Sequence, residues 1–254
     1  MYLLIKTELK KMKRLKITYV GHISILLSAL ITCIQALTMS SGAVTFSDFT
    51  DMYLYNNALL FFPFMLALLG GYLIEREYAL DTRKNLLVIP IKWPDMVKAK
   101  LFVLMFLTVY FSLSAASVSG LCGLLLGCPD LTFSSFFKKA LSFLISGICI
   151  CVGILPLILW FSRKKGTYLW GSVLSALLGI TGVFAATGKF ANWHPVTYCF
   201  SIISDSLTVP TQQEMLSSAA AFAGYLLIAV LMYWGIYREG NKSRSGSKGS
   251  ERGA

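Results

Sequence analysis

The residues of this chain that come closest to a chemical motif form a glycine-rich run at positions 182–190, GVFAATGKF. A phosphate-binding loop has the pattern G-x-x-x-x-G-K-[ST], in which backbone N–H groups and the lysine bind phosphate oxygens and the hydroxyl binds magnesium. The run has one residue too many between its glycines, and Phe190 stands where the hydroxyl would be. We therefore expect that the chain does not bind ATP through this run.

Histidine and cysteine are also poorly spaced for chemistry. His22 and His194 are far apart in the sequence, and neither an H-E-x-x-H nor a C-x-x-C pattern occurs. Zinc proteases and structural zinc sites depend on such spacings. Most of the six cysteines fall in apolar stretches, whereas Cys128 and Cys199 do not, so these two could oxidise to a disulfide. The sequence predicts no catalytic residue, no bound cofactor and no metal site.

The elements that would position any site are strongly apolar. The chain of 254 residues is 56% hydrophobic and 14% charged, with a mean hydropathy of +0.68, unlike an ordinary soluble domain. Six apolar stretches are each long enough, at ~1.5 Å per residue, to cross a hydrocarbon core of ~30 Å. They cover residues 17–38, 52–74, 99–126, 140–160, 168–187 and 216–237. The sequence predicts an all-α integral membrane protein with six transmembrane helices.

Lysine and arginine gather on one side of these stretches. All but three of the 23 lie before the first stretch, in the second and fourth connections or after the last; the exceptions are Lys138, Lys139 and Lys189. Because cytoplasmic loops accumulate Lys and Arg, both termini are predicted to lie inside. Anionic lipid then accounts for the net charge of +11, and no nucleic-acid partner is expected. A cleaved signal peptide is the alternative for the first stretch, but its length and the lack of a clear cleavage site favour an uncleaved span.

Three regions are predicted along the chain. Residues 1–16 carry Tyr2, Ile5, Leu9 and Met12 at three- and four-residue spacing, which is typical of an amphipathic helix lying at the membrane interface. The alternative is a solvated basic terminus. Residues 17–237 form the six-helix transmembrane domain. Residues 238–254 are rich in Gly, Ser and basic residues and are predicted to be a disordered cytoplasmic tail.

The second connection, residues 75–100, has the pattern of a short helix. Three acidic residues, at 75, 77 and 81, precede Arg83 and Lys84, which suits a helix dipole, and Pro90 ends the pattern. Pro94 then restarts a helix before the third span. A helix held between two spans must pack against this protein or a groove on a partner. Its candidate contact residues are Glu75, Glu77, Asp81, Thr82, Arg83, Lys84, Asn85, Leu86 and Leu87.

Polar and small residues inside the spans define two further candidate sites. Gln35, Asn56 and Asn57 could line a path for an amphipathic cargo, although we favour hydrogen bonds between helices. Small residues at four-residue spacing allow helices to approach closely, within one bundle, which we favour, or between subunits. These small residues are Ser119, Gly123, Gly127, Gly171, Ser175 and Gly179.

The fifth connection contains a moderately apolar stretch at residues 193–203. This stretch is too short to cross the membrane, and we expect a re-entrant or outer-interface helix.

This layout resembles the permease subunits of type-2 (ABC-2-type) ABC exporters. The stretch EREYALDTRKNLLVIP at 75–90, followed by KAK at 98–100, is similar to the lantibiotic- and bacitracin-immunity permeases. In that family an acidic residue after the second span leads to a Thr-x-Lys-Asn-Leu-like core and a proline. Thr82, Lys84, Asn85 and Leu86 match this core. The topological resemblance covers nearly the whole chain, whereas the motif covers only the second connection.

The resemblance implies a transport subunit of the bacterial plasma membrane. In the family, the second connection is a coupling helix that seats on a separate P-loop ATPase, where ATP and magnesium bind. A second permease copy, identical or related, completes the pathway, and the cargo is a lantibiotic-type or other antimicrobial peptide. Two alternatives are a non-transporting immunity or sensor subunit that binds a ligand, and an intramembrane enzyme, for which no catalytic cluster is visible.

Overall fold

A computed structural model describes residues 2–12, 16–39, 44–79, 93–163, 166–186, 188, 190–203 and 211–250 of the chain. Within these ranges, the side chains of residues 39, 77–79, 201–202 and 239–250 are not described. Most residues of the predicted coupling helix, from Asp81 to Leu87, therefore lie outside the described part of the chain.

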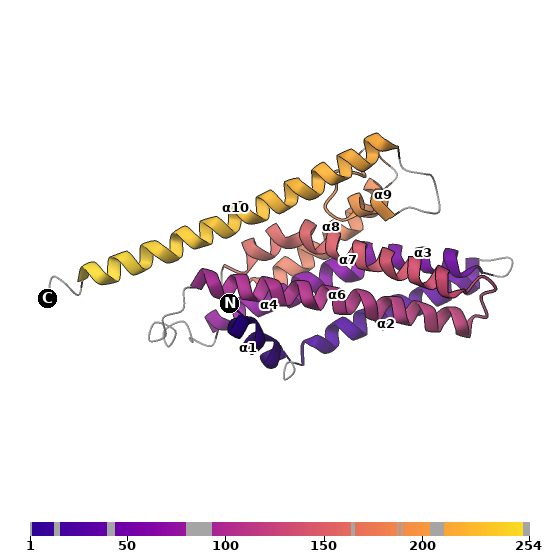
Figure 1. Ribbon diagram of the computed structural model, residues 1–254, viewed down its shortest axis with the longest axis horizontal. Helices are drawn as coiled ribbons and strands as arrows, with labels where there is room; N and C mark the ends of the chain where they lie inside the picture. The colour runs from indigo at the N-terminus through magenta and orange to yellow at the C-terminus, as the bar shows by residue number, and fades with distance from the viewer. Residues whose placement is uncertain are drawn as a thin grey trace.

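The described residues form a bundle of long helices (Figure 1). The helices are α1 (Tyr2–Met12), α2 (Thr18–Met39), α3 (Phe46–Asn56), α4 (Phe62–Ala79), α6 (Trp93–Leu125), α7 (Phe133–Phe161), α8 (Tyr168–Ala185), α9 (Phe200–Ile203) and α10 (Gln212–Ser250). A π-helical turn, η1 (Asn57–Phe61), joins α3 to α4, and a 3₁₀ turn, η2 (Thr197–Cys199), precedes α9. No strand occurs in the described ranges, and the predicted all-α class is confirmed.

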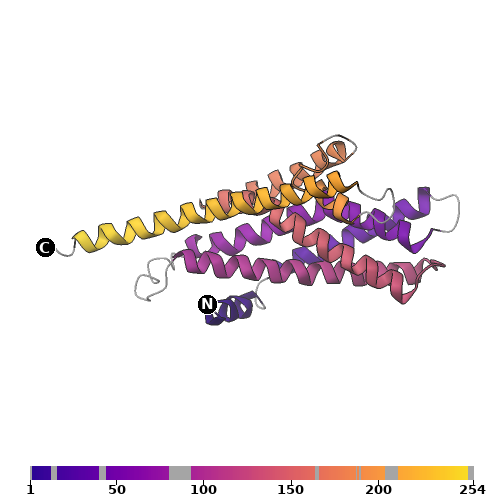
Figure 2. The ribbon, with the colours of Figure 1, turned by 45° about the horizontal axis from the view of Figure 1, so that its top comes forward.

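Six helical segments are long and apolar enough to cross a membrane, as the sequence predicts. They are Thr18–Thr38, Phe46–Arg76, Trp93–Leu125, Phe133–Phe161, Tyr168–Ala185 and Gln212–Arg238. In an apolar 18-residue window of the second segment, 78% of the residues are buried inside the protein, against 17% in the sixth. The continuous helix α3–η1–α4 is therefore the centre of the bundle, with α2, α6, α7 and α8 around α4. Helix α10 lies on the outside (Figures 1 and 2).

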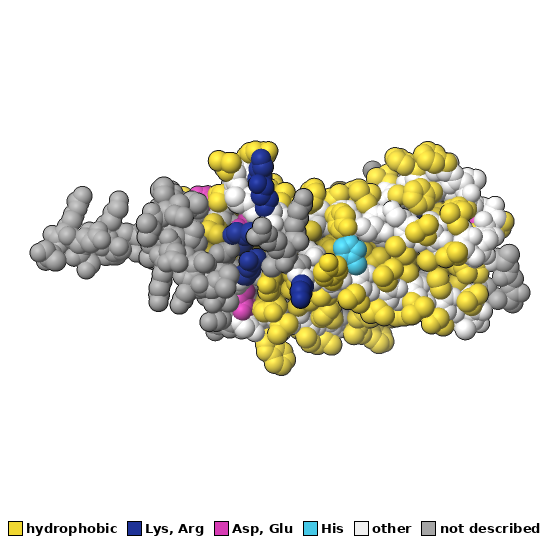
Figure 3. All heavy atoms as spheres, turned by 90° about the horizontal axis from the view of Figure 1, so that it is seen from below, with side chains coloured by type: hydrophobic (Ala, Val, Ile, Leu, Met, Phe, Trp, Pro, Cys, Tyr) yellow, Lys and Arg dark blue, Asp and Glu magenta, His cyan; other side chains and the backbone are white. Residues whose placement is uncertain are grey.

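Contacts between helices define two ends of the bundle. At one end of the bundle, Glu8 pairs with Lys100, and Tyr233 contacts Pro94. We call this end the basic end. At the opposite end, Lys139 pairs with Asp51 at 2.6 Å. Figure 3 shows apolar side chains over most of one face and Lys and Arg side chains confined to the basic-end part. That the basic end faces the cytoplasm stays a prediction.

The second span begins earlier than the hydropathy pattern indicates, at Phe46 rather than residue 52. Thr45 caps α3, because its hydroxyl accepts the Asp48 N–H at 3.1 Å. The carboxylate of Asp130, in the α6–α7 connection, accepts the N–H groups of Phe46 and Ser47. Polar capping residues therefore extend the helix into a stretch that hydropathy alone excludes.

The fifth connection enters the bundle. The Tyr198 hydroxyl of η2 donates to the Cys149 carbonyl at 2.6 Å, near the middle of α7. Tyr225 of α10 donates to the Trp193 carbonyl at 2.7 Å. Val196, Tyr198 and Cys199 are fully buried. The segment is thus hydrogen-bonded to the neighbouring helices α7 and α10. Its assignment as a re-entrant or outer-interface helix stays a prediction.

The last helix continues past the predicted domain boundary. Helix α10 runs to Ser250, whereas the sequence analysis places a disordered tail from residue 238. The tail contains no proline to break a helix that the last span has already nucleated. Nothing in the fold tests the predicted domain boundaries further.

Candidate functional site at the basic end

Glu75 is the residue of the predicted coupling segment that the structure describes most fully. It lies near the end of α4, and its side chain is buried, with 4% of the residue exposed. Glu77 belongs to the same helix, although its side chain is not described. The other predicted coupling residues lie outside the described ranges, so their assignment stays a prediction.

The Glu75 carboxylate caps the beginning of α8. One oxygen accepts the Gly166 N–H, and the other accepts the Tyr168 N–H at 3.1 Å. The first N–H groups of a helix have no partner within the helix, and the helix dipole favours a negative charge there. Gly166 has a φ of 81°, which suits glycine at this turn. Glu75 thus joins the end of the second span to the beginning of the fifth.

Helix α8 then follows α4 closely through the predicted ladder of small residues. A Cβ atom on Gly179 would overlap the Leu59 carbonyl oxygen. That oxygen lies four residues before Pro63, which has no N–H to donate to it. The Ser175 hydroxyl donates to the Pro63 carbonyl at 2.9 Å. Gly171 contacts Phe161 of α7. In the described chain, this ladder therefore packs helices of one bundle together.

The second small-residue group also makes contacts within the chain. A Cβ on Gly123 would lie 2.6 Å from the Phe46 ring. Gly127 has a φ of 66° directly after α6 ends, a conformation that glycine adopts without strain. Ser119 is buried and its hydroxyl donates to the Ala116 carbonyl. A role of either group between subunits stays a prediction.

Helix α1 is attached to the bundle by a buried ion pair that the sequence analysis missed. The Lys100 ammonium lies 3.0 Å from one Glu8 oxygen, and the Lys11 ammonium lies 2.6 Å from the other. The side chain of Lys100 is 1% exposed and that of Glu8 is 7% exposed. Figure 2 shows α1 on the outside of the bundle. The sequence feature that could have indicated this ion pair is that Glu8 is the one acid among the first 16 residues.

Both ends of the predicted coupling segment are thus attached to other helices. Before it, Glu75 holds α8. After it, the Pro94 carbonyl accepts the Tyr233 hydroxyl of α10 at 3.2 Å, and Lys100 binds α1. The described residues on either side of positions 80–92 are therefore bonded to α8, α10 and α1.

The candidate cargo-path residues lie together where α3 meets η1. The Asn56 amide donates to the Thr32 hydroxyl at 2.9 Å and to the Gln35 side-chain oxygen at 2.7 Å. Asn57 is 1% exposed and donates to the Tyr53 carbonyl at 2.9 Å. These bonds from Asn56 of α3 to Thr32 and Gln35 of α2 are hydrogen bonds between helices, which is the role that we favoured over a cargo path. The cargo-path role stays a prediction.

His22 makes hydrogen bonds within the described bundle, and the cysteines are not paired with one another. His22 lies between the Thr18 carbonyl, at 3.1 Å, and the Tyr110 hydroxyl, at 3.0 Å. All six cysteines are free thiols, so the disulfide considered for Cys128 and Cys199 is absent. Cys199 is buried and donates to the Val196 carbonyl at 2.9 Å. In the described residues, no group of three His, Cys, Asp or Glu side chains could hold a metal ion.

The fold and the basic-end contacts define a polytopic helical membrane protein whose second connection is tied to several spans. A family model described as ABC-2 family transporter protein matches residues 4–182. This chain therefore belongs to the ABC-2 transporter family, as a membrane permease of the bacterial plasma membrane. The family implies an ATPase partner, and the chain is a transport subunit.

A curated relative is similar to this chain over much of its length. The bacitracin transport permease protein BCRB of Bacillus licheniformis is 28% identical over 174 residues, which cover 62% of this chain and 83% of the relative. No solved structure matches the chain.

Proposed function

We propose that this chain is the permease subunit of an ABC exporter that expels a lantibiotic-type or other antimicrobial peptide. A separate P-loop subunit hydrolyses ATP with magnesium, and a second permease copy, identical or related, completes the pathway. Membership of the ABC-2 family supports the transport role. The relative named for bacitracin transport supports a peptide-antibiotic cargo.

The double attachment of the predicted coupling segment is the observation that carries the proposal. The ATPase would bind residues 80–92, and Glu75 would pass the resulting movement to α8. Since α8 fits closely against α4 at Gly179 and Ser175, the two helices would move as one body. Rigid-body movement of helices is an established way to switch a transporter. Opening a path at Gln35, Asn56 and Asn57 would require the Asn56–Gln35 bond to break.

The test is a protection assay in a bacitracin-sensitive bacterium. Cells would carry this chain with the ATPase that copurifies with it, either active or with its catalytic glutamate changed to glutamine. The proposal expects that cells are protected against bacitracin only when the ATPase is active. Equal protection with the inactive ATPase would favour the alternative, a non-transporting immunity or sensor subunit.

A further inference from the structure

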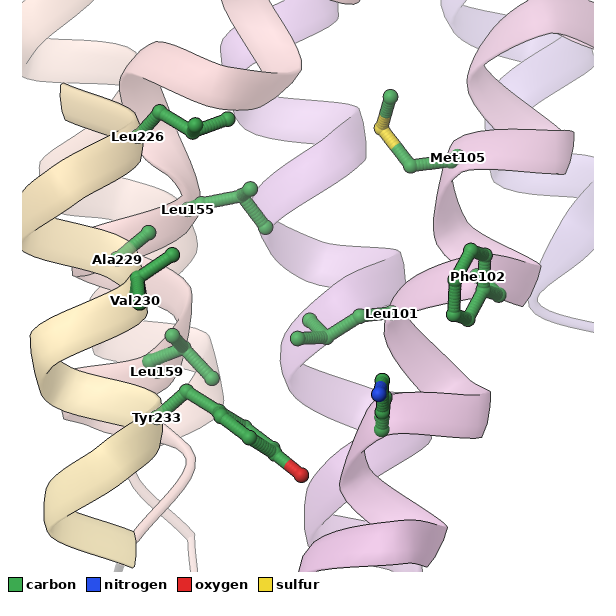
Figure 4. Close-up of a pocket in the computed structure, with 10 residues that line it drawn as sticks. Leu101, Phe102, Met105, Leu155, Leu159, Leu226, Ala229, Val230 and Tyr233 are labelled. Atoms are coloured by element: carbon green, nitrogen blue, oxygen red, sulfur yellow. The ribbon is translucent and has the colours of Figure 1, made fainter. Parts of the chain in front are cut away.

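An apolar groove lies between α6, α7 and α10 in the half of the bundle nearest the basic end. It has a volume of about 250 Å³ and is lined by Lys98, Leu101, Phe102, Met105, Leu155, Leu159, Leu226, Ala229, Val230 and Tyr233. Figure 4 shows the α10 side chains facing those of α6, with Leu155 and Leu159 between them. Phe102, Leu226 and Val230 are also exposed on the outside of the bundle, so the groove opens sideways.

The walls of the groove suit a hydrocarbon chain. Of the ten lining residues, only Lys98 and Tyr233 carry a polar side-chain atom. The Tyr233 hydroxyl already donates to the Pro94 carbonyl. A polar occupant would find hydrogen-bond partners only at Lys98 and at the Tyr233 hydroxyl oxygen, and the rest of the wall is too apolar to hold ordered water. The volume is also below the ~300–1,000 Å³ typical of pockets for bulkier ligands.

The groove is shorter than the hydrocarbon part of one bilayer leaflet. The lining residues run over seven residue steps on α6, from Lys98 to Met105, and over seven on α10, from Leu226 to Tyr233. At ~1.5 Å rise per residue, each wall is about 10 Å long. This is about a third of a ~30 Å hydrocarbon core. An acyl chain entering at the basic end would therefore stay within the leaflet on that side.

The mouth of the groove is basic. Lys98 is exposed and lines the groove at its basic end. Arg163 lies one turn beyond Leu159, beside Gly235 of α10, and its Nε is buried without a hydrogen-bond partner. Among the described residues, the acid Asp95 is close to Tyr233, and the cations Lys98 and Arg163 lie near the same end of the groove. This charge favours a lipid with an anionic headgroup over a zwitterionic one.

We propose that the α6–α7–α10 groove binds one acyl chain of an anionic phospholipid, whose phosphate contacts Lys98 and Arg163. The bound lipid would fill the space between α10 and the rest of the bundle at the depth where Tyr233 contacts Pro94. The lipid would thus pack against α10, the most exposed span, in place of protein side chains.

The experiment measures lipid retention by native mass spectrometry. The full chain, purified with its ATPase where one copurifies, would be equilibrated with dioleoylphosphatidylglycerol or dioleoylphosphatidylcholine in mild detergent. The proposal expects one phosphatidylglycerol per chain, retained at least fivefold better than phosphatidylcholine. Equal retention of the two lipids would overturn it. Competition by millimolar inorganic phosphate would also overturn it, because the site would then bind free phosphate.

Matched variants locate the site. Ala229→Trp fills the groove, whereas Ala223→Trp places the same side chain on an exposed part of α10 that does not line it. Retention of phosphatidylglycerol should fall at least tenfold in the first variant and stay unchanged in the second. Val230→Trp, at the rim, replaces Ala229→Trp should that variant not fold. Equal losses in groove and control variants, or a loss of self-association instead of lipid, would contradict the proposal.

Charge variants test the headgroup contact. Lys98→Gln and Arg163→Gln should each lower phosphatidylglycerol retention about fivefold, as expected for loss of one lysine or arginine near an anionic lipid surface. Lys6→Gln, on α1, removes a charge from the basic end without touching the groove. A loss with Lys6→Gln as large as with Lys98→Gln would mean that only the general surface charge attracts the lipid, and would overturn the proposed site.

Discussion

The carboxylate of Glu75, near the end of the second span, accepts the backbone N–H of Tyr168, the first residue of the fifth span, at 3.1 Å. This bond joins two connections that are 93 residues apart in the chain. It also places a buried acid where the first turn of α8 needs an acceptor. A residue just before the segment proposed to meet the ATPase is therefore bonded to a transmembrane helix.

Removing the Glu75 carboxylate should weaken both the fold and the coupling. In Glu75→Ala, the first turn of α8 loses its acceptor, and we expect a loss of about 1–2 kcal/mol of stability. The ATP-dependent protection of cells against the antimicrobial peptide should fall by more than this loss of stability accounts for. The control is Glu214→Ala, which removes a cap from the exposed start of α10, where Glu214 accepts the Thr211 N–H at 2.9 Å. Thermal unfolding and protection assays measure both effects, and equal protection in the two variants would refute a coupling role for Glu75.

The Glu8–Lys100 pair should be costly to break on one side only. Lys100→Met removes one of the two ammonium groups that the described structure places on the buried Glu8 carboxylate, and we expect a loss of about 3 kcal/mol. The double variant Glu8→Leu with Lys100→Met should regain most of that loss, because neither buried charge of this pair remains. Thermal unfolding of both single variants and of the double variant gives the interaction energy between Glu8 and Lys100.

A more exposed ion pair provides the comparison for that measurement. Asp51 and Lys139 form a pair at the opposite end, with side chains 33% and 13% exposed. Its disruption should cost about 0–1 kcal/mol. A similar cost for the two pairs would show that burial does not determine the contribution of Glu8–Lys100.

Gly179 should be the least replaceable glycine of the small-residue ladder. Gly179→Ala places a methyl group on the Leu59 carbonyl, which is backbone and cannot rotate away. We expect α8 to shift and the stability to fall by about 1–3 kcal/mol. Gly224→Ala on α10 is the matched control, because no atom lies within 4 Å of its added Cβ. That variant should be neutral or stabilised by up to about 1 kcal/mol. A destabilised Gly224→Ala together with a neutral Gly179→Ala would contradict the packing described here.

Asp130 should make stability depend on acid pH. Burial opposes ionisation of Asp130, but hydrogen bonds from Phe46 and Ser47 outweigh it, so the pKa of this carboxyl lies below its ordinary value. The stabilisation is therefore fully present above the ordinary pKa of about 4 and is lost as the pH falls through the lower folded-state pKa. Unfolding temperatures of wild type and Asp130→Asn between pH 7 and pH 3 measure this difference. It should be largest near neutral pH and shrink in acid, and a constant difference would contradict the assignment.

The spans were predictable because hydropathy and length act along the chain, without reference to tertiary contacts. The ends of the spans were harder to predict. Helix α3 begins at Phe46 because Thr45 and the distant Asp130 cap its first turn. Lys100 illustrates the same limit. The sequence places it among the basic residues of a loop, whereas the fold buries it in α6 against Glu8. Sequence periodicity indicates that α1 has an apolar face, but it does not indicate which helix that face meets.

The most direct test of the exporter assignment is affinity purification of this chain from its native membrane, with mass spectrometry of the proteins that accompany it. We predict a stoichiometric P-loop ATPase, which is lost in Asn85→Asp and in Leu86→Asp but retained in the control Gln213→Asp at the opposite end of the bundle. Recovery of the chain without an ATPase, or retention of the ATPase by both coupling variants, would contradict the proposed coupling segment.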